Sequence, residues 1–335
     1  EDAAADHELL VTYQEPEQRT QNAIPLPGGA MLSTKCYWTT WTLLQPLSHG
    51  ADEKSGNVTM FRRQREVDPI TGSINSVPFI SGNAVRGAWR DMAFSRWLAL
   101  LGLQATDIPP ARAHALLAGG SVEAGSDTGA ADPVLRREAR DVCPPWDLFA
   151  GCIDQQIMGG RLQVHDATLV CSETAWRVAR MVAPGVDAAE LARSLPEAAE
   201  CTSLRLGTRQ AHRDLDESDG SQMLFNVEHL IPGCRMVHSL RLVAESCVSD
   251  VARSCIADLL AEFARTPVVG ARLGSGFGSV AFDGYVAAGG ATGLPSPDVY
   301  LGYVSQHRDS MREWALRGSL SASDKRGGKR GKRAA

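Results

Sequence analysis

A turn-rich segment that runs directly into a helix carries the residues best suited to bind an anion. In residues 77–90, Ser81 or Asn83 can cap the helix, and Arg86 and Arg90 follow one turn apart on one of its flanks. A phosphate at this place would meet free backbone amides, the positive end of the helix dipole and two guanidinium groups. Arginines at this spacing are also common on solvated helix faces, so the pair alone does not decide between the two interpretations.

Two further segments offer groups of the same kind. Residues 60–65 place three arginines in a predicted loop, namely Arg62, Arg63 and Arg65. Residues 270–280 carry spaced glycines, but they follow a helix and precede a strand, which is the reverse of a dinucleotide-binding loop and excludes a Rossmann site. We expect this loop either to lie against a phosphodiester backbone or to be a plain glycine-rich connection. The contacts in the first case would come from Arg272, Gly274, Ser275 and Gly276.

Patterns typical of catalytic and metal sites are missing from the sequence. It has no Gly-x-Ser-x-Gly, His-Glu-x-x-His or Walker motif, and its eight cysteines include no Cys-x-x-Cys pair. The cysteines are therefore expected to be reduced and mostly buried. Adjacent strand residues point to opposite faces, so His165 and Asp166 form a poor acid/base pair. We expect no catalytic residue, no metal and no cofactor.

Hydrophobic periodicity predicts the elements that hold these residues. Val85, Trp89 and Met92 recur at helical spacing, which predicts that Arg86 and Arg90 fall beside the buried stripe and that Trp89 belongs to the core. A second core-facing helix is predicted over 251–263, after a cap at Ser249 or Asp250; the strands are predicted over 33–44, 161–165, 236–242 and 277–286.

The resulting order is strand, helix, strand, strand, helix, strand. This order predicts an α+β fold, in which an open antiparallel sheet carries two helices on a single face, as in RRM-like or ferredoxin-like domains, with long insertions between the elements.

Five ordered segments resemble the repeat-associated mysterious protein superfamily of CRISPR systems, and within it the backbone subunits that polymerise along a guide RNA. The resemblance covers about residues 33–286, and the order of the segments is more specific than any one of them. They are Leu43–Gly50, Val77–Arg90, Leu148–Gly151 followed by Gly160–Asp166, Phe225–Gly233 and Gly270–Val280. Residues 60–65 and the Asp-Pro-Ile-Thr-Gly sequence at 68–72 favour the type IV backbone subunit within this superfamily.

The resemblance implies a non-catalytic subunit that binds guide RNA through phosphate and sugar and forms a filament with copies of itself. Type III relatives cut target RNA with an aspartate in the loop before the helix, where this chain has arginines. The resemblance also implies a thumb-like β-hairpin arm at 201–233, which splays the guide. Its proposed RNA contacts are Arg205, Arg209, His212 and Met223.

The implied partners are guide RNA (crRNA), target DNA or RNA paired to it, copies of this chain and other CRISPR effector subunits. Two rival functions remain open. One is an RNA-processing or RNA-cleaving endonuclease of the same superfamily, which would need a histidine or tyrosine near the glycine-rich loop. The other is a structural assembly protein whose arginines meet acidic partner surfaces.

Composition and domain layout agree with a cytoplasmic protein that does not bind membranes. The net charge is −5, so RNA contacts must come from localised arginines, and no apolar run approaches the length of a membrane span. The predicted layout is an N-terminal arm (1–32), an RRM-like palm (33–286) and a C-terminal extension with a basic tail (287–335). Within the palm, residues 102–150 are predicted to be a helical and loop insertion.

Overall fold

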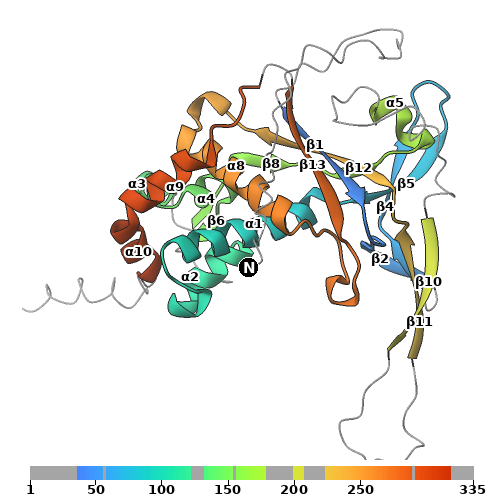
Figure 1. The fold of residues 1–335 in the computed structure, drawn as a ribbon, viewed down its shortest axis with the longest axis horizontal. Helices are drawn as coiled ribbons and strands as arrows, with labels where there is room; N and C mark the ends of the chain where they lie inside the picture. Colours follow the sequence, from blue (N-terminus) through green and yellow to red (C-terminus); the bar gives the residue numbers. More distant parts are fainter. Residues whose placement is uncertain are drawn as a thin grey trace, which may run out of the picture.

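An antiparallel sheet forms the centre of the protein (Figure 1). The computed structural model describes residues 36–55, 58–121, 132–153, 156–178, 199–206, 223–288 and 291–317. The strands of this sheet are β1 (Cys36–Leu43), β4 (Arg63–Val67), β5 (Ile74–Ile80), β8 (Leu162–Val164), β9 (Ala167–Leu169), β12 (Arg235–Leu242) and β13 (Val280–Ala288). They run in the order β13-β1-β12-β9-β5-β4, β8 also pairs with β12, and the pairs are antiparallel.

The order β13-β1-β12-β8/β9 is that of a ferredoxin-like sheet, in which the first strand lies between the last and the third. With α1 (Gly82–Leu100) after the first strand and α8 (Asp250–Arg265) after the third, the element order is the predicted one. The α+β, RRM-like fold class is therefore confirmed, and β5 and β4 extend the sheet beyond this central unit.

Both predicted helices begin at a serine cap. The Ser81 hydroxyl accepts from the backbone N–H of Ala84, and the Ser249 hydroxyl accepts from that of Ala252. Each helix buries one stripe against the sheet. Phe263 on α8 contacts the rings of Trp89 on α1 and of Trp41 on β1, and all three rings are buried.

The alternation over 236–242 predicts a half-buried strand with Met236, His238, Leu240 and Leu242 on its buried face, and these four side chains are all buried in β12. Val237 and Ser239 on the opposite face are buried as well, so β12 is covered on both faces and the prediction of a half-buried strand is wrong. Burial of each large apolar side chain contributes about 1.5–3 kcal/mol, so the face with Met236, Leu240 and Leu242 fixes the register of the sheet.

Residues between α1 and β8 fold mainly as short helices. The elements are η3 (Ala105–Asp107), α2 (Pro110–Ala113), the π-helical turn η4 (His114–Ala118), α3 (Pro133–Val142) and α4 (Pro144–Phe149), followed by the small hairpin of β6 (Gly151–Ile153) and β7 (Gln156–Met158). Trp146 and Phe149 of α4 pack against Phe94 of α1, so this insertion shares the main hydrophobic core.

A second sheet projects away from the main one (Figure 1). It contains β10 (Ala199–Leu206), β11 (Met223–Leu230), β3 (Val58–Phe61) and β2 (Gly50–Ser55), in the order β10-β11-β3-β2. β10 and β11 pair antiparallel from Ala199↔Leu230 to Leu206↔Met223. They form the predicted thumb-like hairpin arm, whose connecting residues 207–222 lie outside the described part of the chain.

The C-terminal residues contain two helices that the sequence analysis did not predict, α9 (Pro297–Gln306) and α10 (Arg308–Leu316). Tyr300 and Val304 of α9 are buried beside α8, and Trp314 of α10 packs edge-on against Trp97 of α1. The predicted basic tail lies outside the described residues, as does the N-terminal arm. The remaining short elements are η5 (Ser172–Thr174), α5 (Ala175–Val178), η7 (Glu245–Cys247) and η8 (Leu273–Ser275).

Candidate nucleic-acid interface

The first turn of α1 is already partly satisfied by the protein itself. Gly82 donates its backbone N–H to Oδ1 of Asp166 at 2.7 Å, and Ala84 donates to the Ser81 hydroxyl at 3.3 Å. A side chain at Gly82 could not fit, because its Cβ would lie 2.3 Å from the carbonyl oxygen of Val164. The expectation of free amides for a phosphate is therefore wrong for Gly82 and Ala84, since a carboxylate and a hydroxyl already accept from them.

Arg90 is the largest departure from the sequence-based expectation. It was predicted to lie beside the buried stripe of α1, but only 4% of it is exposed. Its guanidinium donates to the carbonyl oxygens of Leu116 (2.6 Å), Ala115 (2.7 Å) and Ala150, and it lies over the rings of Phe94 and Trp146. Burial lowers the pKa of Arg90 to about 10, and the neighbouring charge of Arg86 adds to that effect.

The acceptors of Arg90 explain why a cation is buried there. Ala115 and Leu116 belong to the turn that ends at Ala118, and Ala150 directly follows the last residue of α4. Carbonyls at helix C-termini lack intrahelical partners and carry partial negative charge, so one guanidinium caps two helix ends. Arg90 is thus a structural residue, which corrects its assignment as a phosphate contact.

Arg86 lies one turn earlier and is only half-buried. It donates to the carbonyl oxygen of Phe149 and stacks its guanidinium over the Phe149 ring, with 5.5 Å from Cζ to the ring centroid. Burial lowers the pKa of Arg86. No carboxylate is recorded as an ion-pair partner of Arg86 or Arg90 within the described residues. The two cations therefore remain uncompensated by acidic side chains there.

A groove of about 570 Å³ opens along this flank of α1. The wall on α1 is formed by Asn83, Arg86, Gly87 and Arg90. The facing wall includes Gly119, Phe149, Gly151, Met158, Gly159 and Gly160. Gly151 has φ +149°, and a Cβ there would lie 2.6 Å from the carbonyl oxygen of Gly119, so glycine permits the close approach of these two segments. The binding residues on the α1 side of this groove were predicted from the sequence, whereas those of the facing wall were not, although its glycines are clustered in the sequence.

The arginine-rich segment was expected to be a loop, but most of it is strand. Arg62 joins β3 to β4, while Arg63 and Arg65 belong to β4, because residues 63–67 pair with Ile74–Pro78 of β5. Arg63 forms an ion pair with Glu228 of β11 and donates to the carbonyl oxygen of Ser76 at 3.2 Å. Arg65 is exposed. Arg63 therefore ties the arm to the main sheet, a role that the sequence did not reveal.

The glycine-rich loop presents an exposed tip at Leu273–Gly276. Arg272 and Gly276 adopt left-handed backbone conformations, with φ of +63° and +83°, which turns the chain at both ends of η8. At the base of the loop, the backbone N–H of Ala271 donates to the carbonyl oxygen of Ser48 at 2.7 Å. The backbone N–H of Gly278 donates to the carbonyl oxygen of Pro46 at 2.8 Å.

One short segment, residues 47–50, joins three of the predicted binding segments. Ser48 accepts from Ala271 of the glycine-rich loop, and Nε2 of His49 accepts from the backbone N–H of Ser81 at 3.3 Å. The carbonyl oxygen of His49 also accepts from the backbone N–H of Arg62 at 2.7 Å. The structure thus brings the Arg62 segment, the start of α1 and the glycine-rich loop together around this segment.

The predicted contacts of the arm are only partly described. Arg205 lies in β10 and Met223 begins β11, but their side chains are outside the described part of the structure. Arg209 and His212 lie wholly outside it. The base of the arm is fixed by the Glu228 carboxylate, which accepts from the backbone N–H of Phe61 at 2.8 Å and pairs with Arg63.

Potential acid/base groups take structural roles. Asp68 accepts from the backbone N–H of Ile70 at 2.8 Å and from the Thr71 hydroxyl at 2.9 Å, as expected for a turn. The Ile70 hydrogen bond is the main cause that lowers the pKa of Asp68. His229 packs edge-on against Phe277 of the glycine-rich loop, a proximity that sequence inspection missed, but it is buried. Among the described residues, no cluster of three or more His, Cys, Asp or Glu side chains is placed to hold a metal.

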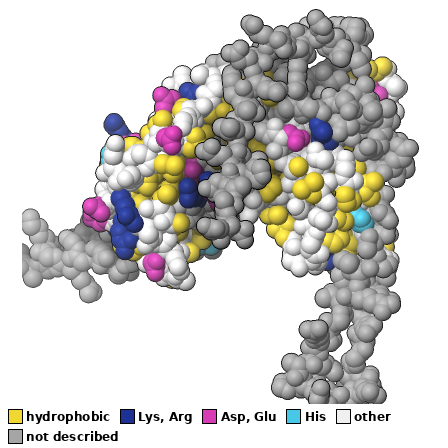
Figure 2. All heavy atoms as spheres, viewed as in Figure 1, with side chains coloured by type: hydrophobic (Ala, Val, Ile, Leu, Met, Phe, Trp, Pro, Cys, Tyr) yellow, Lys and Arg dark blue, Asp and Glu magenta, His cyan; other side chains and the backbone are white. Residues whose placement is uncertain are grey.

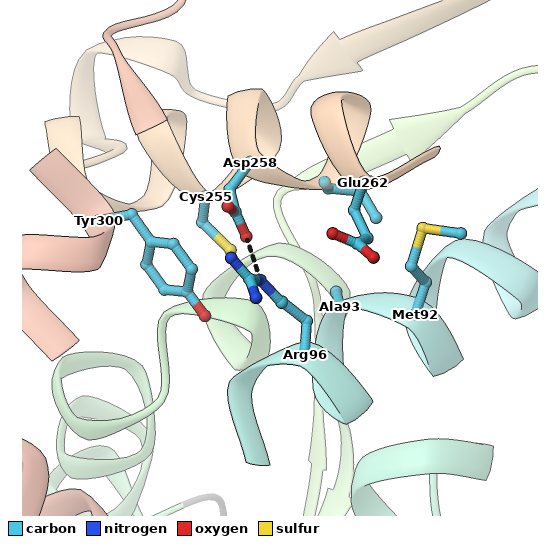
Figure 3. Close-up of a pocket in the computed structure, with 8 residues that line it drawn as sticks. Met92, Ala93, Arg96, Cys255, Asp258, Glu262 and Tyr300 are labelled. Atoms are coloured by element: carbon cyan, nitrogen blue, oxygen red, sulfur yellow. Dashed lines mark ion pairs between the residues drawn. The ribbon is translucent and has the colours of Figure 1, made fainter. Parts of the chain in front are cut away.

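A second cluster of polar side chains, between α1, α8 and α9, is closed by its own ion pair (Figure 3). Arg96 extends towards Asp258, with 3.5 Å between Nε and Oδ2, and Tyr300 packs beside Cys255. Burial raises the pKa of Asp258 and the charge of Arg96 opposes that shift. This cluster stabilises helix packing, and the groove beside Arg86 remains the better candidate site.

Charged side chains are mixed over the visible surface. Figure 2 shows basic and acidic side chains interspersed among the described residues of one face. Within the described part of the chain, no helix combines the length and apolar character needed to cross a membrane.

Comparisons with solved structures find chains that match this one. No family model matches the chain, and no curated protein matches it. A solved chain described as "Type IV-B CRISPR Complex" is similar over 79% of this chain and 96% of its own length, with 20% sequence identity and a TM-score of 0.49. A likeness at this level assigns neither a family nor a function.

Proposed function

We propose that this protein is a non-catalytic backbone subunit of a type IV CRISPR effector complex, which binds guide RNA and assembles in several copies along it. The proposal rests on the five ordered segments that resemble such subunits and on the RRM-like fold that carries them. The RNA would be held by phosphate and sugar, because a subunit of this kind must accept any guide sequence.

The observation that carries the proposal is the position of residues 47–50. These residues hydrogen-bond to the Arg62 segment and to the glycine-rich loop through the backbone, and to the Ser81 cap of α1 through the His49 side chain, although the glycine-rich loop is far from the other two in the sequence. The arm leaves from the same region, since β11 pairs in parallel with β3 at Asn226↔Val58. A single-stranded guide RNA bound to all three segments would follow one continuous path towards the arm.

The first test is whether RNA accompanies the protein. The test uses full-length protein that is coexpressed with a CRISPR array and purified at moderate salt. We expect bound RNA to raise its ratio of absorbance at 260 nm to that at 280 nm, and we expect the extracted RNA to be of uniform length. The protein should sediment as a multimer. Protein from cells that lack the array is the control. A nucleic-acid-free monomer under both conditions would contradict the proposal.

The two rival functions make different predictions in the same preparation. A structural assembly protein would form multimers without RNA. An endonuclease would shorten labelled guide precursor during incubation, whereas the proposed subunit would leave it intact. His49 is the histidine to replace in that assay, because its segment contacts the glycine-rich loop through Ser48.

A further inference from the structure

The arm sheet and the main sheet meet where the chain passes from one sheet to the other. β3 pairs with β2 and β11 of the arm sheet, and β4, which begins two residues after β3 ends, pairs with β5 of the main sheet. Arg62 lies between them. Its backbone N–H donates to the carbonyl oxygen of His49 at 2.7 Å, and its carbonyl oxygen accepts from the backbone N–H of Phe79 at 3.2 Å. Strands that change sheets bend at the crossing point, so the contacts around this point set the angle between the two sheets.

Glu228 of β11 holds both sides of this junction. One of its carboxylate oxygens accepts from the backbone N–H of Phe61 in β3 at 2.8 Å, and the other forms the ion pair with Arg63 in β4. Arg63 also donates to the carbonyl oxygen of Ser76 in β5 at 3.2 Å. The Glu228 side chain is 12% exposed, so water screens the pair only weakly. Among the ion pairs recorded for the described residues, this is the one that joins the two sheets.

The next two residues of β11 attach the arm to segments of the proposed RNA path. His229 is buried against the ring of Phe277 in the glycine-rich loop, with 5.7 Å between the ring centroids. Leu230 exchanges two backbone hydrogen bonds with Leu47, at 2.8 and 3.0 Å. The orientation of the arm is therefore set where these segments converge. Because a carboxylate repels phosphate, Glu228 is suited to hold the arm and not to hold the RNA.

The arm turns a small change at its base into a large one at its far end (Figure 1). β3 pairs with β11 at Asn226 and Val227, so residues 223–225 of β11 extend past this pairing with β10 as their strand partner. At a rise of about 3.4 Å per residue, Met223 lies about 17 Å beyond Glu228, so a rotation of about 10° at the base moves it by about 3 Å. Such a displacement breaks hydrogen bonds and packed contacts.

We propose that Glu228 is a positioning residue, which sets the orientation of the arm through its ion pair with Arg63 and thereby controls the assembly of copies separately from RNA binding. This inference rests on the proposed function, since the surface that the arm would contact belongs to a second copy on the same RNA. Arg63 is then committed to the arm and does not serve as a phosphate contact.

Glu228→Gln tests the ion pair with little risk to the fold. The amide keeps an oxygen that can accept from the N–H of Phe61 but loses the charge that pairs with Arg63. Glu200→Gln is the control, because it removes the same charge from the facing strand β10, where residue 200 lies opposite His229. A double variant that combines Arg63→Glu with Glu228→Arg restores an ion pair with its charges exchanged.

RNA binding and assembly are measured separately on full-length protein. The affinity of one subunit comes from the fluorescence anisotropy of a labelled RNA short enough that the wild type binds it as a monomer. Assembly is the protein concentration at which multimers form on a long RNA, followed by sedimentation. We expect Glu228→Gln to bind the short RNA like wild type but to need roughly fivefold or more protein to assemble. Glu200→Gln should match wild type in both assays, and the double variant should recover assembly at least in part.

Hydrogen–deuterium exchange shows whether the change is confined to the arm. In Glu228→Gln, deuterium uptake should rise in residues 223–230 and stay at the wild-type level in α8, which packs in the main core. A rise in α8 as well would overturn the inference, because the loss of assembly would then reflect a destabilised fold.

The remaining outcomes separate this inference from the proposed function. Wild-type assembly in Glu228→Gln would overturn the inference and leave the proposed function intact. Equal losses in Glu228→Gln and Glu200→Gln would also overturn it, since the net charge and not the ion pair would be responsible. Loss of affinity for the short RNA in the double variant would return Arg63 to the RNA contacts and overturn it too. Wild-type protein that binds no RNA would overturn the proposed function, and with it this inference.

Discussion

Replacing Arg90 by alanine is expected to destabilise the protein by about 3–5 kcal/mol. The change removes hydrogen bonds to the carbonyls of Ala115, Leu116 and Ala150, and each buried acceptor left unpaired costs about 1–3 kcal/mol, with some recovery through water. It also removes the cation from the rings of Phe94 and Trp146 and leaves a cavity in the core.

The matched control is Arg86→Ala, one turn away on the same helix. Arg86 is half-exposed and gives one backbone hydrogen bond and one ring contact, so its loss should cost about 1 kcal/mol. Urea denaturation followed by circular dichroism compares the two free energies of unfolding. In a thermal scan the Arg90 variant should melt roughly 5–10 °C below wild type. If the two variants were equally stable, the buried network would contribute nothing and our account of Arg90 would be refuted.

Three further predictions follow from the arm, the arginine-rich segment and the buried histidine. Replacing residues 209–221 by a short Gly/Ser bridge should preserve the fold but abolish filament formation, and sedimentation of multimers of normal size would refute a role of the arm in assembly. In the presence of Mg²⁺ or Mn²⁺, the guide-loaded protein should not cut target RNA paired to the guide, because arginines occupy the segment where the type III relatives that cut RNA carry an aspartate. Cleavage products at regular spacing that disappear in Asp52→Ala or Asp68→Ala would contradict this prediction. Burial lowers the pKa of His238 to about 3, so below pH 6.5 the unfolded state binds a proton at this histidine that the folded state does not bind. The free energy of unfolding should therefore fall as the pH drops below 6.5, by up to about 1.4 kcal/mol per pH unit. His238→Gln should show a flatter dependence in urea denaturation at pH 7, 6 and 5, and an unchanged slope would show that His238 is not the responsible group.

The sequence determined the central fold because the signals involved are local. Serine caps before α1 and α8 and a repeat of about four residues on each helix depend only on neighbours along the chain. The order of these elements then permits few arrangements, and the observed sheet is the expected one. The helices α9 and α10 were missed, since their apolar residues become meaningful only against α8 and α1.

The candidate site was predicted as a set of segments, and only the tertiary structure decided which groups remain available. Arg86 and Arg90 are equivalent in sequence and both line the groove, yet Arg86 stays half-exposed and Arg90 is buried, because the ends of two helices from the insertion lie over Arg90. Asp166 satisfies the first amide of α1, and Glu228 pairs with Arg63 across 165 residues of chain. Residue type and spacing determine what a side chain can bind, but burial and competing partners from distant segments determine whether it is still available to a ligand, and these depend on the packed fold.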